Sequence, residues 1–162
     1  LNQNKNSELN TSTTQILEGE DNINPINVFE NLYLIPSDTD IIKHNSEKIV
    51  GGSKLRKIRQ NETIKTFDVV FIDTPPTMSS LVQEALSTSD YYFIPSKPEF
   101  LAVEGVGQAM EFAKQTIYEV PHTSPSFLGV VLNQVDTRRA SYKDLVLELK
   151  QILSDKLFKT TW

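Results

Sequence analysis

One stretch, FDVVFIDTPP at residues 67–76, constrains this chain more than any other. Four apolar residues, Val69 to Ile72, run unbroken into Asp73, and Pro75 and Pro76 follow one residue later. A continuous apolar run is typical of a parallel strand that is covered on both faces. Proline fixes φ and restricts the residue before it, so the backbone behind the acid is stiff. The stretch therefore predicts a buried strand that presents a carboxylate at its carboxyl end.

Strands and helices alternate in the sequence that follows. We expect a helix at residues 80–90, a strand at 91–96, a helix at 99–120, a strand at 127–136 and a helix at 141–158 with Ser141 as its N-cap. The inward positions of these helices are Leu81, Val82, Ala85 and Leu86, then Val103, Val106, Met110, Ala113 and Ile117, then Leu145, Leu149, Ile152 and Leu153. The alternation predicts an α/β fold, a mostly parallel sheet with helices on both faces. Ligands bind such sheets at the carboxyl ends of the strands, where Asp73, Pro95 and Asn133 lie.

The first part of the chain has weaker signals. Residues 1–30 are rich in Asn, Ser and Thr and are expected to be irregular, with at most one short helix. Residues 31–38 predict a strand that ends at Pro36, and the basic stretch at 47–62 predicts a surface helix interrupted near Gly51 and Gly52. We expect one domain over residues 1–162, with its α/β body at 31–162.

The amino-acid composition excludes several classes of chemistry for this chain. The 162 residues include no cysteine, which excludes disulfides, thiolate catalysis and iron–sulfur ligation within them. A net charge of −5 argues against a surface that binds nucleic acid all over, but leaves room for a local basic patch. No apolar run reaches membrane-spanning length, and nothing has the pattern of a signal peptide.

Asp73 can be interpreted in two ways from the residues alone. A strand-end aspartate can cap the next helix. An acid directly behind an apolar strand is also the Walker B arrangement, in which the carboxylate holds a water of a Mg²⁺ shell. The rigid residues Thr74, Pro75 and Pro76 suit a loop that senses a γ-phosphate.

Five stretches of sequence, which follow one another in the family's order, resemble the ParA/MinD/Soj family of partition ATPases. FDVVFIDTPPTMSSLVQEAL is similar to the family's Walker B and switch II segment, and SDYYFIPSKPEFLAVEGV to the block after it. FLGVVLNQVDTRRASYKDLVLELKQIL resembles the third block, while QILEGE and NLYLIPSDTDI resemble the segments upstream. The resemblance spans nearly the whole chain and implies a P-loop NTPase-like fold.

The resemblance also implies roles for single residues. Asp73 would be catalytic and would hold Mg²⁺ through water, and Thr74 would lie at the bound ATP. Asn133 would contact adenine, although a strand-end Asn can equally bond its own turn. Arg138 and Arg139 would bind DNA without sequence preference, whereas the nearby lysines Lys143 and Lys150 are expected to form a solvated face.

At the level of the whole protein, the resemblance implies a homodimer when ATP is bound. It further implies non-specific DNA and a centromere-binding ParB-like protein as partners, no membrane attachment, and a cytoplasmic, nucleoid-associated location. Two alternatives remain open: a MinD-like ATPase that positions cell division, and a degenerate binding module that has lost enzymatic activity.

The family's KGGVGKT loop is absent from these residues. VGGSKL at 50–55 has the wrong spacing for a P-loop, and GVGQAM at 105–110 fails the dinucleotide fingerprint. The family's loop and first strand would precede Leu1. We therefore expect a fragment of the P-loop NTPase-like fold that hydrolyses no ATP by itself.

Overall fold

The computed structural model describes residues 10–47, 49, 52–99, 101–135, 138 and 140–159. The chain divides into two compact units, Leu1–Thr88 and Ser89–Trp162, and each is described by itself. The single domain expected from the sequence stays a prediction.

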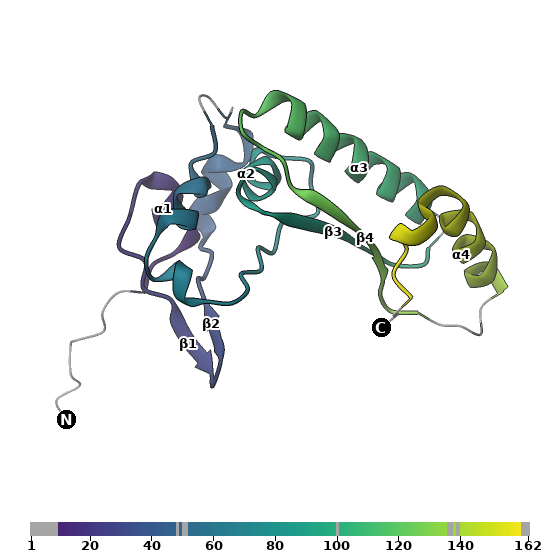
Figure 1. The fold of residues 1–162 in the computed structure, drawn as a ribbon, viewed down its shortest axis with the longest axis horizontal. Helices are drawn as coiled ribbons and strands as arrows, with labels where there is room; N and C mark the ends of the chain where they lie inside the picture. The colour runs from purple at the N-terminus through teal and green to yellow at the C-terminus, as the bar shows by residue number, and fades with distance from the viewer. Residues whose placement is uncertain are drawn as a thin grey trace. The chain divides into compact units, whose positions relative to one another are not determined.

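The first unit begins with a capped helix and a hairpin (Figure 1). Helix α1 (Thr13–Glu18) starts at Ser12, which forms a capping box with Gln15, and ends at Gly19 in the left-handed region at φ 117°. Strands β1 (Ile26–Phe29) and β2 (Leu32–Leu34) pair antiparallel. The short helix and β2 confirm two sequence predictions, whereas β1 lies in the segment expected to be irregular.

Short helices complete the first unit. They are the 3-10 helices η1 (Thr39–Ser46), η2 (Leu55–Gln60) and η3 (Ile64–Thr66), followed by helix α2 (Ser80–Thr88), which confirms its prediction. Within the surface helix predicted at residues 47–62, the described residues are helical in η2. Leu55 and Ile58 are both buried there, and their three-residue spacing suits a 3-10 turn. The main buried apolar cluster of this unit consists of Ile16, Leu17, Ile23, Leu55, Ile58 and Ile64.

The strand predicted at residues 67–73 is wrong for the structure of this chain. These described residues form an extended loop between η3 and α2, and Val69, Val70 and Phe71 are exposed. A helix makes its hydrogen bonds within its own sequence, but a strand needs a neighbour to accept and donate them. No strand pairs with this segment among the described residues, so it stays extended but unpaired.

The second unit is built on a parallel β–α–β arrangement. Strands β3 (Tyr91–Ser96) and β4 (Ser126–Leu132) pair in parallel and are connected through helix α3 (Ala102–Glu119). Helix α4 (Ala140–Leu153) and the 3-10 turn η4 (Ser154–Lys156) follow, and Leu157 then pairs with Val130. Both strands and both helices confirm the sequence predictions.

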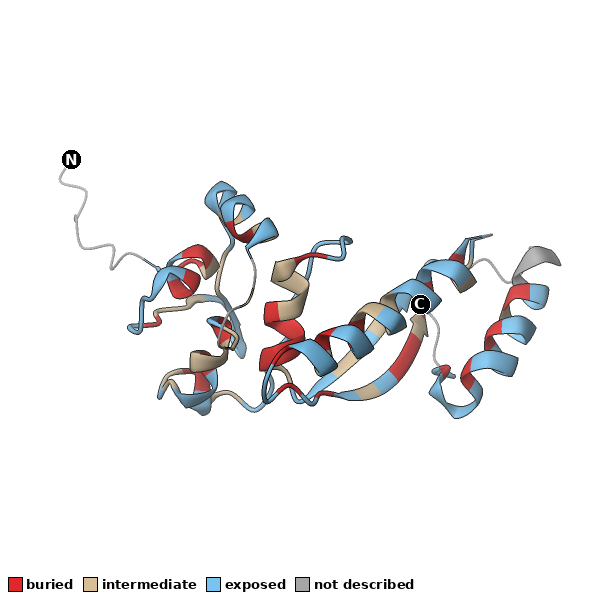
Figure 2. Ribbon diagram, turned by 90° about the horizontal axis from the view of Figure 1, so that it is seen from above, coloured by how far each residue is buried: buried red, intermediate tan, exposed pale blue. Residues whose placement is uncertain are grey.

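The core of the second unit lies between the strand pair and its helices. Its buried members are Ala102, Val106, Val130, Leu132, Leu145, Leu149, Leu153 and Leu157. Buried residues gather on one side of each long helix and exposed ones on the other (Figure 2). Two details differ from expectation: α4 begins at Ala140, so Ser141 is not its N-cap, and Ile152 is 60% exposed.

Candidate functional site

Asp73 lies in a loop that is attached to the unit before the acid and makes a local turn behind it. Before it, the ring of Phe67 contacts Tyr33 with centroids 5.1 Å apart, and Ile72 packs against the core of the first unit. Behind it, the N–H of Thr77 donates to the carbonyl oxygen of Pro75 at 2.8 Å. The loop is therefore attached to the rest of the unit through Phe67 and Ile72, and the hydrogen bond behind the acid forms a local turn.

The carboxylate of Asp73 faces solvent. Asp73 and Thr74 are both exposed, and no described residue donates a hydrogen bond to the Asp73 side chain. Helix α2 begins seven residues later, at Ser80, so Asp73 does not cap it. Pro75 and Pro76 have no N–H, so neither of these two residues can donate to the carboxylate through its backbone. The geometry leaves the oxygens of Asp73 available to accept hydrogen bonds from the water shell of a metal ion.

Asn133 lies at the carboxyl edge of the parallel strand pair. Its backbone N–H donates to the carbonyl oxygen of Ser96 at 2.9 Å, so the ends of β3 and β4 lie side by side. Its side-chain oxygen accepts from the N–H of Gln134 at 2.8 Å, and Gln134 has φ 57°. This is the turn that the sequence left as an alternative. Asn133 is exposed and its amide nitrogen donates to no described residue, so adenine recognition stays a prediction.

The predicted DNA-binding arginines come directly before α4 in the sequence. Arg138 is exposed, and Arg139 lies outside the described residues. Lys143 and Lys150 are exposed on α4, as a solvated charged face requires. The structure brings together the ends of β3 and β4 within the second unit. Asn133 and Arg138 belong to that unit and Asp73 to the first, so each of these residues is described only within its own unit.

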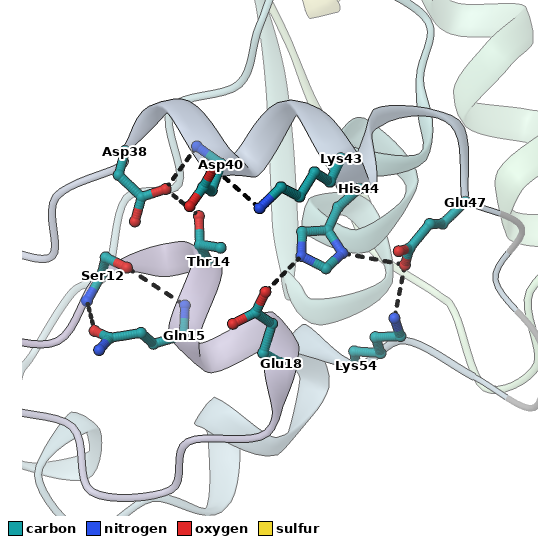
Figure 3. A network of polar contacts seen from close by, with 10 residues as sticks. All are labelled: Ser12, Thr14, Gln15, Glu18, Asp38, Asp40, Lys43, His44, Glu47 and Lys54. Carbon is teal, nitrogen blue, oxygen red and sulfur yellow. Dashed lines mark hydrogen bonds and ion pairs between the residues drawn. The ribbon is translucent and has the colours of Figure 1, made fainter.

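Sequence reasoning missed one polar cluster in the first unit. His44 is buried between Glu18 and Glu47, and Lys54 contacts Glu47 (Figure 3). His44 and Glu47 are three residues apart, whereas Glu18 and Lys54 come from other segments, and no motif links the four residues. Within the described residues, no group of three or more His, Asp or Glu side chains is arranged to hold a metal ion. Nor does any described helix combine the length and the apolar character needed to cross a membrane.

Comparison with known proteins connects this geometry to a family. The family described as AAA domain matches residues 2–124. Soj of Bacillus subtilis, a sporulation initiation inhibitor protein, is 30% identical over 133 residues, which cover 81% of this chain and 52% of that protein. The chromosome-partitioning ATPase Soj of Treponema pallidum is 27% identical over 151 residues, covering 90% and 59%.

The chain belongs to the ParA/MinD/Soj family of partition ATPases. A crystal structure of a Borrelia burgdorferi protein assigned to plasmid partition and bound to AMPPNP agrees in fold, with a TM-score of 0.66 and 25% identity, and covers 90% of this chain and 57% of that one. The predicted α/β, P-loop NTPase-like fold class is thereby confirmed.

The match to ParA/MinD/Soj proteins is partial in length. The chain spans between half and three fifths of the two Soj relatives, 52% and 59%. None of its 162 residues forms the G-x-x-x-x-G-K-[ST] pattern that cradles phosphates. The activity of a whole partition ATPase is therefore a proposal for this chain.

Proposed function

We propose that this chain provides the Walker B, base-recognition and DNA-binding parts of a ParA-type ATPase that acts in plasmid or chromosome partition. ATP and Mg²⁺ would close two copies into a dimer, and the dimer would bind DNA without sequence preference. The observation that carries the proposal is Asp73. Its exposed carboxylate, with no donor from the described residues, lies in the segment FDVVFIDTPP that resembles the family's Walker B motif.

The carboxylate oxygens of Asp73 are of the kind that binds Mg²⁺ and its waters. Mg²⁺ keeps most of its waters and is bound through one or two carboxylates together with phosphate oxygens. In phosphoryl transfer, the metal neutralises the charge that develops on the transferred group. In this proposal, Asp73 would hold a metal-bound water, and the two prolines that follow Thr74 would keep Thr74 in place.

The nucleotide and DNA contacts are assigned with the same reasoning. Asn133 would offer its amide nitrogen to adenine, since its oxygen is engaged by Gln134. Arg138 and Arg139 would contact phosphates near the start of α4. The binding of AMPPNP, an ATP analogue, by the Borrelia protein supports ATP as the nucleotide. A centromere-binding ParB-like partner and a cytoplasmic, nucleoid-associated location complete the proposal by analogy with the family.

The test uses the full-length protein. Asp73→Ala should reduce ATP hydrolysis, measured as phosphate release, to background, because the metal-bound water loses its acceptor. Asp68→Asn is the matched control, since Asp68 is an exposed acid of the same loop and has no assigned role. Equal turnover in Asp73→Ala and the wild type would contradict the Walker B assignment.

DNA binding is tested on the same protein. Arg138→Ala should weaken binding to unrelated duplexes to the same extent and should reduce the salt dependence of binding. Each phosphate contact that is removed lowers the number of counterions released when the protein binds DNA. Lys143→Ala, a change on the exposed face of α4, is the control. Loss of affinity for one DNA sequence only would contradict a phosphate-contacting role.

A non-enzymatic binding module is the second candidate, because no phosphate-cradling pattern occurs in these residues. Calorimetric titration of the 162-residue chain with Mg-ATP should then show no tight site. The titration bears on this chain alone, whereas hydrolysis by the full-length protein decides between the ATPase and the binding module.

A further inference from the structure

Helix α2 is attached to η2 through the buried side chain of Glu84. Glu84 is 7% exposed, and the two hydrogen bonds described for its side chain converge on one oxygen. The hydroxyl of Ser53 donates to Oε2, and so does the N–H of Leu55 at 2.9 Å. The oxygen of Ser53 in turn accepts from the N–H of Arg56 at 3.2 Å. A side chain of α2 is therefore bonded, directly and through Ser53, to the start of η2.

These contacts take the place of a local cap on η2. The helix begins at Leu55, and the residue before it, Lys54, makes no capping hydrogen bond with its side chain. The first N–H groups of a helix have no partner within it, and a buried carboxylate is costly unless donors surround it. Glu84 and Ser53 satisfy the first two N–H groups of η2, and these donors stabilise the carboxylate in return. Each of the two helices therefore depends on the other.

A further contact holds the end of α2. Nη1 of Arg59, on η2, donates to the carbonyl oxygen of Thr88 at 2.8 Å, and Thr88 is the last residue of α2. The hydroxyl of Thr88 donates back to the carbonyl oxygen of Glu84 at 2.8 Å. The two points of attachment on α2 are about one helical turn apart. A helix that is attached at two points is fixed in direction as well as in position.

The loop behind Asp73 depends on α2. Within the described part of the chain, the hydrogen bonds of residues 74–79 join this segment to itself and, where the N–H of Gln83 donates to the carbonyl oxygen of Ser79 at 3.1 Å, to α2. Two prolines in the segment fix φ, so the link is short and stiff. Ile72 anchors the loop before the acid, and α2 anchors it behind.

We propose that Glu84 is a positioning residue for the loop that carries Asp73. Glu84 holds α2 on η2, and α2 holds the backbone behind the acid, so that the carboxylate of Asp73 keeps one place relative to a bound metal ion and its waters. The metal-binding part of this inference rests on the proposed function. Both donors meet at one oxygen of Glu84, and the oxygen of a glutamine has lone pairs for both. Residue 84 therefore has to supply an acceptor rather than a charge.

The first test uses the full-length protein without nucleotide. Threonine amides labelled with ¹⁵N report on α2 through Thr88 and on the loop through Thr74 and Thr77. Glu84→Leu should move all three signals, whereas Glu84→Gln should leave them at their wild-type positions. Gln83→Leu is the matched control, because it places the same side chain one residue earlier and no hydrogen bond described for Gln83 uses its side chain.

The spectra can contradict the proposal in two ways. A change at Thr88 alone would overturn it, because α2 would then move without the loop. Equal changes in Glu84→Leu and Glu84→Gln would overturn it as well, because they would assign the effect to the charge. If Glu84→Leu does not fold, Ser53→Ala replaces it, since this change removes one donor to Glu84 and the acceptor for the N–H of Arg56. Smaller movements of the same three signals are then expected, and unchanged spectra would overturn the proposal.

The second test measures the metal dependence of ATP hydrolysis by the full-length protein. Glu84→Leu should raise the Mg²⁺ concentration for half-maximal phosphate release about tenfold, as is typical when a residue that orients a metal ligand is lost. Glu84→Gln and Gln83→Leu should leave it near the wild-type value. The same Mg²⁺ dependence in all variants would overturn the positioning role. A wild-type protein that hydrolyses no ATP would instead contradict the proposed function, and the threonine spectra would then decide the role of Glu84 by themselves.

Discussion

Gly129 allows the segment that follows α4 to pack closely against β4. The pairing with β3 shifts register between Tyr92 and Phe93, and Gly129 lies at the shift with φ 145°. A Cβ at this position would overlap the carbonyl oxygen of Lys156 and lie 2.9 Å from its carbon. The absence of a side chain therefore lets the segment after α4 approach β4, where Leu157 pairs with Val130.

Gly129→Ala should lower the free energy of unfolding by about 1–3 kcal/mol, through the strained φ and the overlap with backbone. Gly105→Ala is the control, because a Cβ there meets nothing within 4 Å and the residue lies in α3. That change should raise stability by about 0.5–1 kcal/mol. Urea denaturation followed by far-UV circular dichroism measures both, and equal effects would contradict the role of Gly129.

Asp38 makes the stability of the first unit depend on pH. Hydrogen bonds from the hydroxyls of Ser12 and Thr14 hold its pKa below the ordinary value, and Thr14 donates to its carboxylate at 2.7 Å. A group with a lowered pKa in the folded state stabilises above its unfolded pKa and loses that effect as the pH falls through its folded pKa.

Asp38→Asn should therefore destabilise at neutral pH, with the difference from wild type shrinking as the pH is lowered below about 4. Asp144→Asn, a change of an exposed acid on α4, is the control. Denaturation midpoints between pH 3 and 7 measure the effect. A deficit in Asp38→Asn that stays constant with pH would show that the carboxylate charge is not the cause.

Sequence reasoning located single residues better than it located their partners. It placed Asn133 at a strand end, and the structure shows that its oxygen is used by Gln134, one residue away. It gave no sign of the His44 cluster, in which tertiary packing brings Glu18 and Lys54 to the local pair of His44 and Glu47. Local spacing carries information on turns and caps, but not on ion pairs between distant segments.

At the scale of elements, helices were predicted well because their hydrogen bonds and faces are local. Leu145, Leu149 and Leu153 recur every four residues and are buried on α4 as expected. Ile152 was expected to face inward too, but it lies about 100° around the helix from Leu153, outside a narrow buried stripe. The loop at 67–73 could not be predicted in the same way, because strand formation depends on a neighbour.

The buried face of α4, formed by Leu145, Leu149 and Leu153, can be tested by substitution. Leu149 is 1% exposed and Leu147 is 60% exposed. Leu149→Ala should cost about 2–5 kcal/mol, because it leaves a cavity in the core of the second unit. Leu147→Ala should change stability by no more than about 0.5 kcal/mol. Denaturant midpoints compare the two, and similar losses would mean that α4 does not use this face.

At the scale of the whole molecule, the first unit exposes an unusual amount of apolar surface. Phe71 is 80% exposed, Val69 65% and Phe29, on the hairpin, 73%. The hairpin and the loop are connected through the contact of Tyr33 with Phe67. Exposed apolar side chains that gather into one patch mark a place where another chain or segment binds. In the loop, the backbone is also extended and unpaired among the described residues, which favours strand pairing between molecules.

The chain should therefore self-associate in a concentration-dependent way, and Phe71→Glu should reduce the association. A charge in the extended loop opposes both apolar contact and strand pairing, two devices that natural sheet edges use against aggregation. Ile42→Glu is the matched control: Ile42 is 71% exposed, but it lies in η1, which offers no extended edge. Sedimentation velocity over a range of concentrations gives the readout. An equal effect of both changes would assign the association to apolar exposure alone, and a monodisperse wild-type monomer would contradict it, because the loop would then be stable without a partner.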